Sequence, residues 1–342
     1  MLESAPITIR WLKIDGQALV PLPHDQPGII PLHSLCHDII ALTAWQDDSP
    51  VAMVGVLSNN NKLSVTVPDN SLHYPPASDR IADDPWRLII RAVRNVAAQV
   101  NIPNLEVLVP DEDLPGTPFI RRSLIRSGLK QQATIGCWER NGSDEFSDTP
   151  PTPTVSALPA KVVCNDTSLR EQMLQLLQRV LENSIDLANI ESPTPEQLLA
   201  EWLDSDAILL VEFNASEIPV AVCCCVNHDG NPRCDSPRTV EIRYLGVHPD
   251  WRRQGAAYRL TQAAAHFAIT GKLPAPFPHL NHNTELPPTF TDFARLEVNV
   301  DEDNTPAVSL YKNTNFVCTR RLQLWTSKVP ADSSGRSLPN QF

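Results

Sequence analysis

Apolar residues in the second half of the chain follow helical spacing in some segments and form continuous runs in others. One helix is predicted behind Ser168 and Glu171, which match the S-x-x-E capping box, and its apolar positions are Leu169, Met173, Leu176, Leu177 and Val180. A second helix is predicted from Thr194-Pro195. Apolar runs predict strands at 160–164, 207–213, 219–230, 238–247, 295–300 and 320–326, with helices at 256–269 and 305–313. This order, β-α-α-β-β-β-α-β-α-β, predicts a mixed α/β sheet with one strand–helix–strand crossover.

The boundary between two domains is predicted from composition. A chain of 342 residues is long for a single core. Residues 141–160, NGSDEFSDTPPTPTVSALPA, are rich in Pro, Ser, Thr and Asp and show neither helical nor strand period. We therefore expect one domain at 1–140, a linker at 141–160, a second domain at 161–329 and a flexible tail at 330–342.

The first half contains a faint copy of the end of the second. The matching residues are Leu105-Glu106-Val107 with Leu296-Glu297-Val298, Ser123-Leu124 with Ser309-Leu310, and Trp138 with Trp325. The segment PWRLIIRAVRNVAAQ also precedes the first copy as AYRLTQAAAHFAI precedes the second. Internal duplication is the interpretation that this order favours.

Composition excludes several classes of protein. The formal net charge of −12 argues against nucleic acid as a partner, and no apolar run is long enough for a membrane helix. The first residues, MLESAPITIRWLKID, lack the basic and apolar regions of a signal peptide, so a cytoplasmic location is expected.

Of eight cysteines none forms a C-x-x-C pair, and Cys223–Cys225 lie in a predicted buried strand. His279 and His282 stand in a proline-rich segment, so no metal site is expected.

The segment RRQGAA, Arg252–Ala257, has the chemistry of an anion site. It lies between the apolar run EIRYLGV and the alanine-rich predicted helix. The N-terminus of a helix offers unpaired N–H groups and a partial positive charge. Gly255 would let the backbone approach an anion closely, with Arg252 and Arg253 at the edge. The pattern predicts a pyrophosphate-binding loop.

With this loop the chain resembles the GNAT superfamily of N-acetyltransferases, whose signature [Q/R]-x-x-G-x-[G/A] holds the pyrophosphate of acetyl-CoA. A second motif, roughly N-x-x-A-x-x-L-Y-x-x-x-G-F, is matched by Asn304, Ala307, Leu310, Tyr311 and Phe316. Asn315 replaces the usual glycine, and asparagine is the next best residue at a left-handed helix end. The resemblance covers about residues 160–328.

The resemblance implies a role for each matched residue. The N–H groups of Arg253, Gln254, Gly255, Ala256 and Ala257 would hold the pyrophosphate, and Arg252 would add charge. The backbone of Leu245, Gly246 and Val247 would line the pantetheine arm where two strands part at a bulge, for which Gly246 is well placed. Asn304 would join the cofactor-binding residues.

Catalytic roles are implied for two side chains. Tyr311 matches the family's usual general acid near the CoA sulfur; the alternative is that it only packs. By resemblance Glu241 is the candidate base, because it stands eleven residues before Arg252, the spacing of the histone acetyltransferase branch. Strand alternation would also put it on one face with Arg243, Leu245 and Val247. A salt bridge of Glu241 with Arg243 or Arg295 is the alternative, and Glu297 is the second candidate base.

The first half has no such loop. Asp83 and Asp84 precede Pro85 at the corresponding helix start, where they would cap the helix but repel a pyrophosphate, and Ile125 stands opposite Tyr311. The resemblance therefore implies two GNAT-like domains in tandem, each with a parallel crossover, of which the first is degenerate. The arrangement resembles that of mycothiol synthase.

The function expected from the resemblance is an acetyl-CoA-dependent N-acetyltransferase. It would transfer an acetyl group directly, in a ternary complex, to the primary amine of a small molecule or peptide. No cysteine stands beside a histidine in a nucleophile context, so an acyl-cysteine route is not indicated. The alternatives are a non-catalytic CoA-binding or scaffold protein and a transferase of a longer acyl group.

Overall fold

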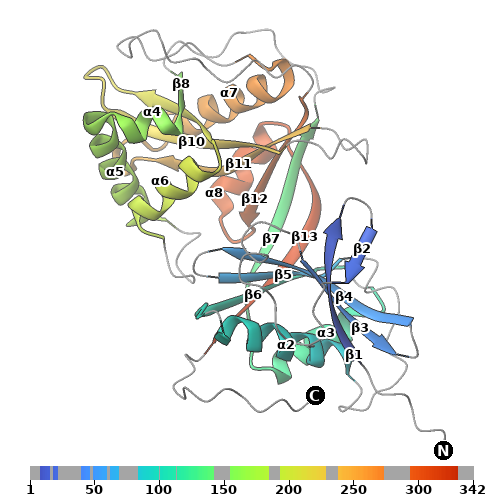
Figure 1. The fold of residues 1–342 in the computed structure, drawn as a ribbon. Coiled ribbons are helices and arrows are strands. Elements are labelled where there is room, and N and C mark those ends of the chain that lie inside the picture. The colour runs from blue at the N-terminus through green and yellow to red at the C-terminus, as the bar shows by residue number, and fades with distance from the viewer. Residues whose placement is uncertain are drawn as a thin grey trace, which may run out of the picture. The chain divides into compact units, whose positions relative to one another are not determined.

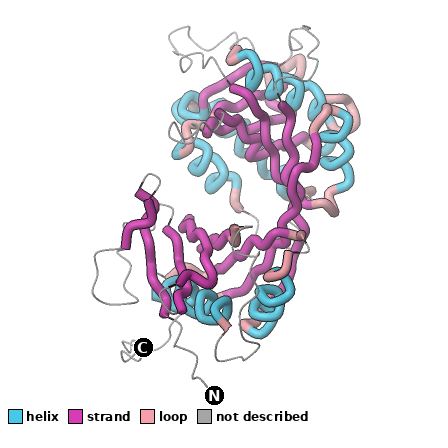
Figure 2. Tube along the Cα trace, turned by 90° about the vertical axis from the view of Figure 1, so that its right-hand side faces the viewer, coloured by secondary structure: helices cyan, strands magenta, loops and turns pink. Residues whose placement is uncertain are grey.

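The computed structural model describes residues 8–15, 18–21, 40–46, 49–59, 62–68, 84–99, 101–112, 114–141, 155–184, 193–228, 238–272 and 293–329. Strands and helices form two compact units of mixed α/β structure (Figures 1 and 2). The first unit comprises residues 1–135 and 320–342, and the second comprises 136–319. Among the described helices, none is both long and apolar enough to cross a membrane.

The first unit is a sheet with helices on one face. Its elements are β1 (Thr8–Asp15), β2 (Ala18–Pro21), β3 (Ile40–Gln46), β4 (Ser49–Asn59), β5 (Lys62–Thr66), α2 (Pro85–Gln99), β6 (Asn104–Pro110) and α3 (Thr117–Arg126). The strand order is β2-β1-β3-β4-β5-β6-β13, with β5 and β6 parallel and joined through α2. Apolar residues of α2 and α3 pack on alternate residues of β3–β6 to make the core.

The second unit places helices on both faces of its strands. Its elements are β8 (Val155–Pro159), α4 (Ala160–Asn165), α5 (Thr167–Leu181), α6 (Pro195–Asp204), β9 (Ile208–Phe213), β10 (Pro219–His228), β11 (Arg238–Val247), α7 (Ala256–Thr270), β12 (Phe293–Asp301) and α8 (Thr305–Asn313). The order is β7-β12-β11-β10-β9-β8, with β11 and β12 parallel. One apolar cluster joins the strands to α7 and α8, and another joins them to α4, α5 and α6. We call these the α7 face and the α5 face.

Two long strands pass from one unit to the other. β7 (Lys130–Asn141) begins in the first unit and ends in the second, and β13 (Val317–Lys328) does the reverse. The two tryptophans matched in the sequence follow this exchange. Trp325 of β13 lies in the core of the first unit, and Trp138 of β7 lies in the core of the second.

These boundaries differ from the expected domains 1–140 and 161–329. Without β13, strand β6 would expose a row of unpaired N–H and C=O groups. The antiparallel pairing of β13 with β6, from Leu322↔Pro110 to Lys328↔Asn104, removes that edge. The end of the chain therefore completes the first unit.

Three local predictions need correction. The predicted linker 141–160 contains the buried strand β8, while residues 142–154 and the tail 330–342 lie outside the described residues. Residues 160–164, predicted as a strand, form the helix α4 because the chain turns at Pro159 and buries Ala160 and Val163. Helix α5 is capped by Asp166, whose carboxylate accepts the N–H of Leu169 at 2.9 Å, and not by the predicted Ser168–Glu171 box.

Replacing Trp325 with alanine tests the exchange of strands. The side chain is 5% exposed in the core of the first unit, so its loss should cost about 3–5 kcal/mol of stability there. Hydrogen exchange should show protection lost in α2 and β6 and kept in α7 and β10. Val317→Ala, on the exposed start of the same strand, is the control and should change neither the stability nor the hydrogen-exchange protection. Loss of protection in α7 and β10 with α2 unaffected would contradict the assignment.

Candidate functional site

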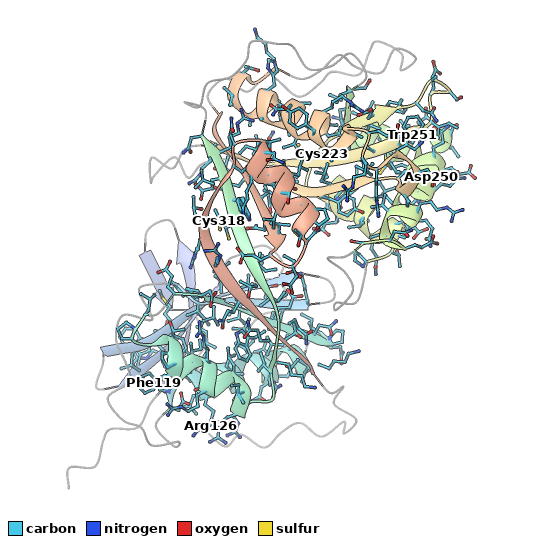
Figure 3. The ribbon with its side chains drawn as sticks, turned by 180° about the vertical axis from the view of Figure 1, so that it is seen from behind. Phe119, Arg126, Cys223, Asp250, Trp251 and Cys318 are labelled. Atoms are coloured by element: carbon cyan, nitrogen blue, oxygen red, sulfur yellow. The ribbon has the colours of Figure 1, made fainter. Side chains whose placement is uncertain are left out.

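The loop between β11 and α7 contains two residues in the left-handed backbone conformation. A single 3₁₀ turn, Pro249–Trp251, follows the strand (Figure 3). Arg253 then has φ +63° and Gly255 has φ +83°. Glycine takes this conformation at little cost, whereas an arginine there is strained, which is common at functional sites. The side chains of Arg252, Arg253 and Gln254 are exposed along this loop.

Helix α7 begins without a side-chain cap. Gly255 is the N-cap residue, and no side chain accepts a hydrogen bond from the first turn. The first helical bond runs from the N–H of Arg259 to the carbonyl of Gly255, at 3.0 Å. The N–H groups of Ala256, Ala257 and Tyr258 therefore have no acceptor inside the helix, so their partial positive charge suits an anion. A pyrophosphate group fits this arrangement of residues.

Arg259 was not singled out from the sequence, yet it fixes this loop. Its Nη2 lies 2.6 Å from Oε1 of Glu212 and its Nε 3.1 Å from Oε2, while Nη1 donates to the Gln254 carbonyl at 3.0 Å. The Glu212 side chain on β9 is only 7% exposed, so the carboxylate depends on this bidentate partner. The sequence did contain one signal for this ion pair, because Glu212 is an acidic residue near the end of an otherwise apolar strand.

Strand β11 contains a bulge at Arg243. Pairing with β10 passes from Cys224↔Tyr244 to Cys225↔Ile242, so Arg243 is the extra residue. Gly246 pairs regularly with Val222, and the predicted bulge at Gly246 is wrong. A Cβ on Gly246 would lie 2.9 Å from Val180 Cγ1 of α5. Gly246 therefore allows close packing of that helix.

The bulge changes which face each site residue uses. Leu245 and Val247 pack on the α7 face, in the cluster that contains Tyr311. Glu241 pairs with Val226, which lies in the α5-face cluster. Simple alternation predicted that Glu241 shares a face with Leu245 and Val247, and this prediction is wrong. The extra residue at Arg243 reverses the alternation between them.

Strands β11 and β12 part where the bulge begins. Their parallel register runs from Arg238↔Phe293 to Ile242↔Val298 and ends there, although β11 continues to Val247 and β12 to Asp301. The backbone of Tyr244–Val247 is thus released from β12 just before the anion loop. The parting of two strands at a bulge agrees with what the family resemblance implied.

Both candidate bases form ion pairs. Glu241 Oε2 lies 3.1 Å from Nη2 of Arg243, whose Nη1 lies 3.9 Å from Oε1 of Glu201 on α6. Glu297 is the register partner of Glu241 on β12, and its Oε1 lies 2.7 Å from Nε of Arg295. The two carboxylates therefore occupy one face of neighbouring strands. The salt bridge with Arg243 weighed as the alternative for Glu241 is present.

The end of α8 fixes Tyr311. Asn315 has φ +65°, and the N–H groups of Asn315 and Phe316 donate to the carbonyls of Lys312 and Tyr311 at 3.3 and 3.0 Å. This is a Schellman motif, and the rings of Tyr311 and Phe316 are 5.3 Å apart. The left-handed role predicted for Asn315 is confirmed. Asn304 caps the other end of α8, where its side chain accepts the N–H of Ala307 at 3.2 Å.

The corresponding helix start in the first unit is closed by a carboxylate. Asp84 Oδ1 accepts the N–H groups of Trp86 and Arg87 at 3.0 and 3.2 Å, and its other oxygen accepts the hydroxyl of Ser123. An anion would meet a negative charge there, as predicted, while Asp83 lies outside the described residues. Helix α3 also ends in a Schellman motif, in which Gly128 corresponds to Asn315 of α8. When the two motifs are compared, Leu124 of α3 corresponds to Tyr311 of α8. The prediction that Ile125 is the counterpart of Tyr311 is therefore wrong by one residue, and the side chain of Ile125 is exposed.

The three consecutive cysteines are buried apolar residues. The hydrogen bond with Cys225 and burial raise the pKa of the Cys223 thiol, and burial raises the pKa of the Cys224 thiol. Cys223 is labelled in Figure 3. Such thiols stay protonated and unreactive at neutral pH. The described residues contain no group of metal-binding side chains, and His279 and His282 lie outside them.

Comparisons with known proteins bear on this site. Residues 171–275 match the model of the acetyltransferase (GNAT) family, while none of the curated proteins matches significantly. A GCN5-related N-acetyltransferase from Sphaerobacter thermophilus has a TM-score of 0.52 at 16% identity, over 84% of this chain and 80% of the other.

Two further structures are similar to the chain. A conserved protein of unknown function from Staphylococcus epidermidis has a TM-score of 0.51 at 11% identity, over 80% of this chain and 90% of the other. A tandem GNAT protein of clavulanic acid biosynthesis has a TM-score of 0.47 at 14% identity, over 85% of this chain and 83% of the other. At these identities, the likeness to the Sphaerobacter and Staphylococcus proteins shows the fold.

Proposed function

We propose that the chain, whose residues 171–275 match the model of the acetyltransferase (GNAT) family, transfers an acetyl group from acetyl-CoA to a primary amine. One observation carries the proposal. The uncapped start of α7 at the left-handed Gly255 lies directly after the strand segment that β12 releases. These two features suit the pyrophosphate and the extended arm of one ligand.

The chain's own residues would hold the ligand in two places. The N–H groups from Arg253 to Ala257 would bind the pyrophosphate, with Arg252 and Arg253 adding charge at the rim. The backbone of Leu245–Val247 would pair with the pantetheine arm as a neighbouring strand does. Acetyl-CoA supplies the activated acetyl group, and the position of the loop is maintained by Arg259 and Glu212.

Proton transfer would use residues on the two faces of the strands. Glu241, on the α5 face, is the proposed base that accepts the proton of the attacking amine, with Glu297 as the second candidate. Tyr311 lies in the cluster that Leu245 and Val247 contact, on the α7 face. It is the proposed acid that donates a proton to the departing thiolate. We infer that amine and thioester meet where β11 and β12 part.

We also infer that the two units derive from one GNAT-like fold in tandem. The order parallel strand, crossover helix, strand, helix, strand occurs as β5-α2-β6-α3-β7 and as β11-α7-β12-α8-β13. Both second helices end in a Schellman motif, at Gly128 and at Asn315. Asp84 stands where Gly255 opens the other copy, which supports acetyl-CoA binding in the second unit alone.

Replacing Gly255 with aspartate or with asparagine tests the anion loop. A Cβ at this position would lie 2.8 Å from Arg259 Nη1, so both variants carry the same steric strain and differ in charge. Acetyl-CoA should bind the Asp variant about tenfold or more weaker than the Asn variant, because the carboxylate repels the pyrophosphate at the helix start. Thermal shift and calorimetry measure this. Equal affinities, or no binding to the unmodified chain, would sink the proposal.

A pair of variants separates the two roles of Glu241. Glu241→Gln should lower kcat about a hundredfold and remove the acidic limb of the pH–rate profile, since the base is gone. Arg243→Gln breaks the same 3.1 Å ion pair but keeps the carboxylate, so it should retain most of kcat. If both variants lose kcat equally with unchanged pH profiles, Glu241 is only a structural partner. Acetyl-CoA binding without turnover in the unmodified chain would favour a non-catalytic protein.

A further inference from the structure

Helices α2 and α3 of the first unit are strongly basic in an acidic protein. Each carries three arginines and no aspartate or glutamate, although the chain as a whole has a net charge of −12. On α2 the arginines are Arg87, Arg91 and Arg94, spaced four and three residues apart. This spacing places them on one side of the helix, where like charges repel one another. The concentration of charge therefore costs stability unless an anion offsets it.

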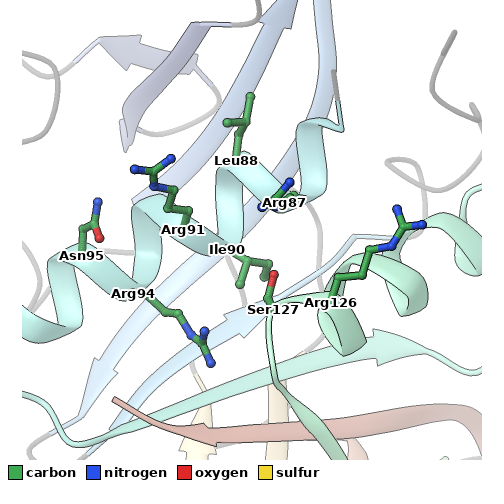
Figure 4. A pocket seen from close by; sticks show the side chains of 8 residues that line it. All are labelled: Arg87, Leu88, Ile90, Arg91, Arg94, Asn95, Arg126 and Ser127. Atoms are coloured by element: carbon green, nitrogen blue, oxygen red, sulfur yellow. The ribbon is translucent and has the colours of Figure 1, made fainter. Parts of the chain in front are cut away.

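A cavity of about 440 Å³ lies at this basic surface. Its lining includes Arg87, Arg91, Arg94 and Asn95 from α2, and Arg126 and Ser127 from the end of α3 (Figure 4). The volume is in the range of sites for small molecules. Asn95, Ser127 and the four arginines of this lining carry hydrogen-bond donors of the kind that phosphate or carboxylate oxygens accept.

The arginines of the cavity differ from their neighbours on α3. Arg121 is paired with Asp111 at 3.0 Å, and the guanidinium of Arg122 lies 5.6 Å from the centre of the Phe119 ring. Within the part of the chain that the structure describes, no carboxylate pairs with the four cavity arginines. Their positive charge is therefore not neutralised by the described side chains.

Arg94 lies deepest among them. It is half-buried, its Nη2 donates to Ser327 Oγ at 2.9 Å, and its buried Nε has no acceptor among the described residues. Burial lowers the pKa of the Arg94 guanidinium, because the charged form loses contact with water. A bound anion would restore the lost stabilisation of that charge.

We propose that this cavity binds a small polyanion, a molecule that carries phosphate groups or several carboxylates. The site lies along the side of α2, while the N-terminus of the same helix is occupied by Asp84. It uses none of the residues of the anion loop before α7. The first unit, in which the crossover helix is closed to pyrophosphate, thus has a binding surface of its own. A concave site of this volume favours a small molecule over a nucleic acid or an acidic protein.

Calorimetric titration of the full chain with inorganic pyrophosphate and with citrate, at constant ionic strength, tests the site. Arg87→Gln with Arg91→Gln removes two exposed charges and should weaken binding about tenfold or more. Lys161→Gln with Arg170→Gln is the matched control, since it removes two exposed charges from the second unit and should leave the affinity unchanged. Arg94→Gln should weaken binding further. The exposed double variant keeps the test valid if Arg94→Gln does not fold.

The outcomes separate the possible ligands. Tighter binding of pyrophosphate assigns a phosphate-bearing ligand, and tighter binding of citrate assigns a polycarboxylate. Equal affinity of the cavity double variant and the chain with an intact cavity, or an equal loss in the control, would overturn the proposal. So would binding of an oligonucleotide or an acidic peptide where neither small anion binds. The titration uses neither acetyl-CoA nor activity, and it is run in the Gly255→Asp chain, whose anion loop repels pyrophosphate, so that its result is independent of the proposed function.

Discussion

The extra residue at Arg243 in β11 is the constraint on which the geometry of the second unit depends. A strand that pairs regularly on both sides would remain bonded to β12 along its length and would keep its side chains in strict alternation. The bulge ends the pairing after Ile242↔Val298 and reverses the alternation. As a result Leu245 and Val247 contact the cluster of Tyr311, while Glu241 lies on the other face. The proposed acid, Tyr311, and the proposed base, Glu241, thus lie on opposite faces of the strands.

Charge at a helix start distinguishes the two units. Helix α7 begins at a glycine in left-handed conformation, and its free N–H groups are available to an anion. Helix α2 begins at Asp84, which has already satisfied the equivalent N–H groups. The helix start thus has free N–H groups in one unit and a carboxylate cap in the other. The first unit carries its positive charge along α2 and α3 instead, in the cavity lined by arginines.

The features predicted correctly from the sequence are those with local causes. The start of α7 directly after Gly255, the asparagine after α8 and the carboxylate before α2 each depend on backbone within a few residues. The features that were missed depend on distant segments. The ion pair of Arg259 with Glu212 joins α7 to β9, and the bulge at Arg243 is defined only by its pairing with β10.

The exchange of β7 and β13 was hidden for a related reason. The two strands are similar copies, so the sequence contains no signal for which of them completes which sheet. Local competition explains the remaining errors. Asp166 and Ser168 are both good caps for α5, and the carboxylate of Asp166 captures the N–H of Leu169.

Hydrogen exchange of the backbone amides, with and without acetyl-CoA, tests most directly whether the start of α7 alone holds the ligand. The amides of Ala256, Ala257 and Tyr258 have no helical acceptor and should exchange rapidly in the free protein. Acetyl-CoA should slow their exchange together with that of residues 244–247, and should leave residues 84–88 of α2 unchanged. Protection at the start of α2, or none at the start of α7, would contradict the account.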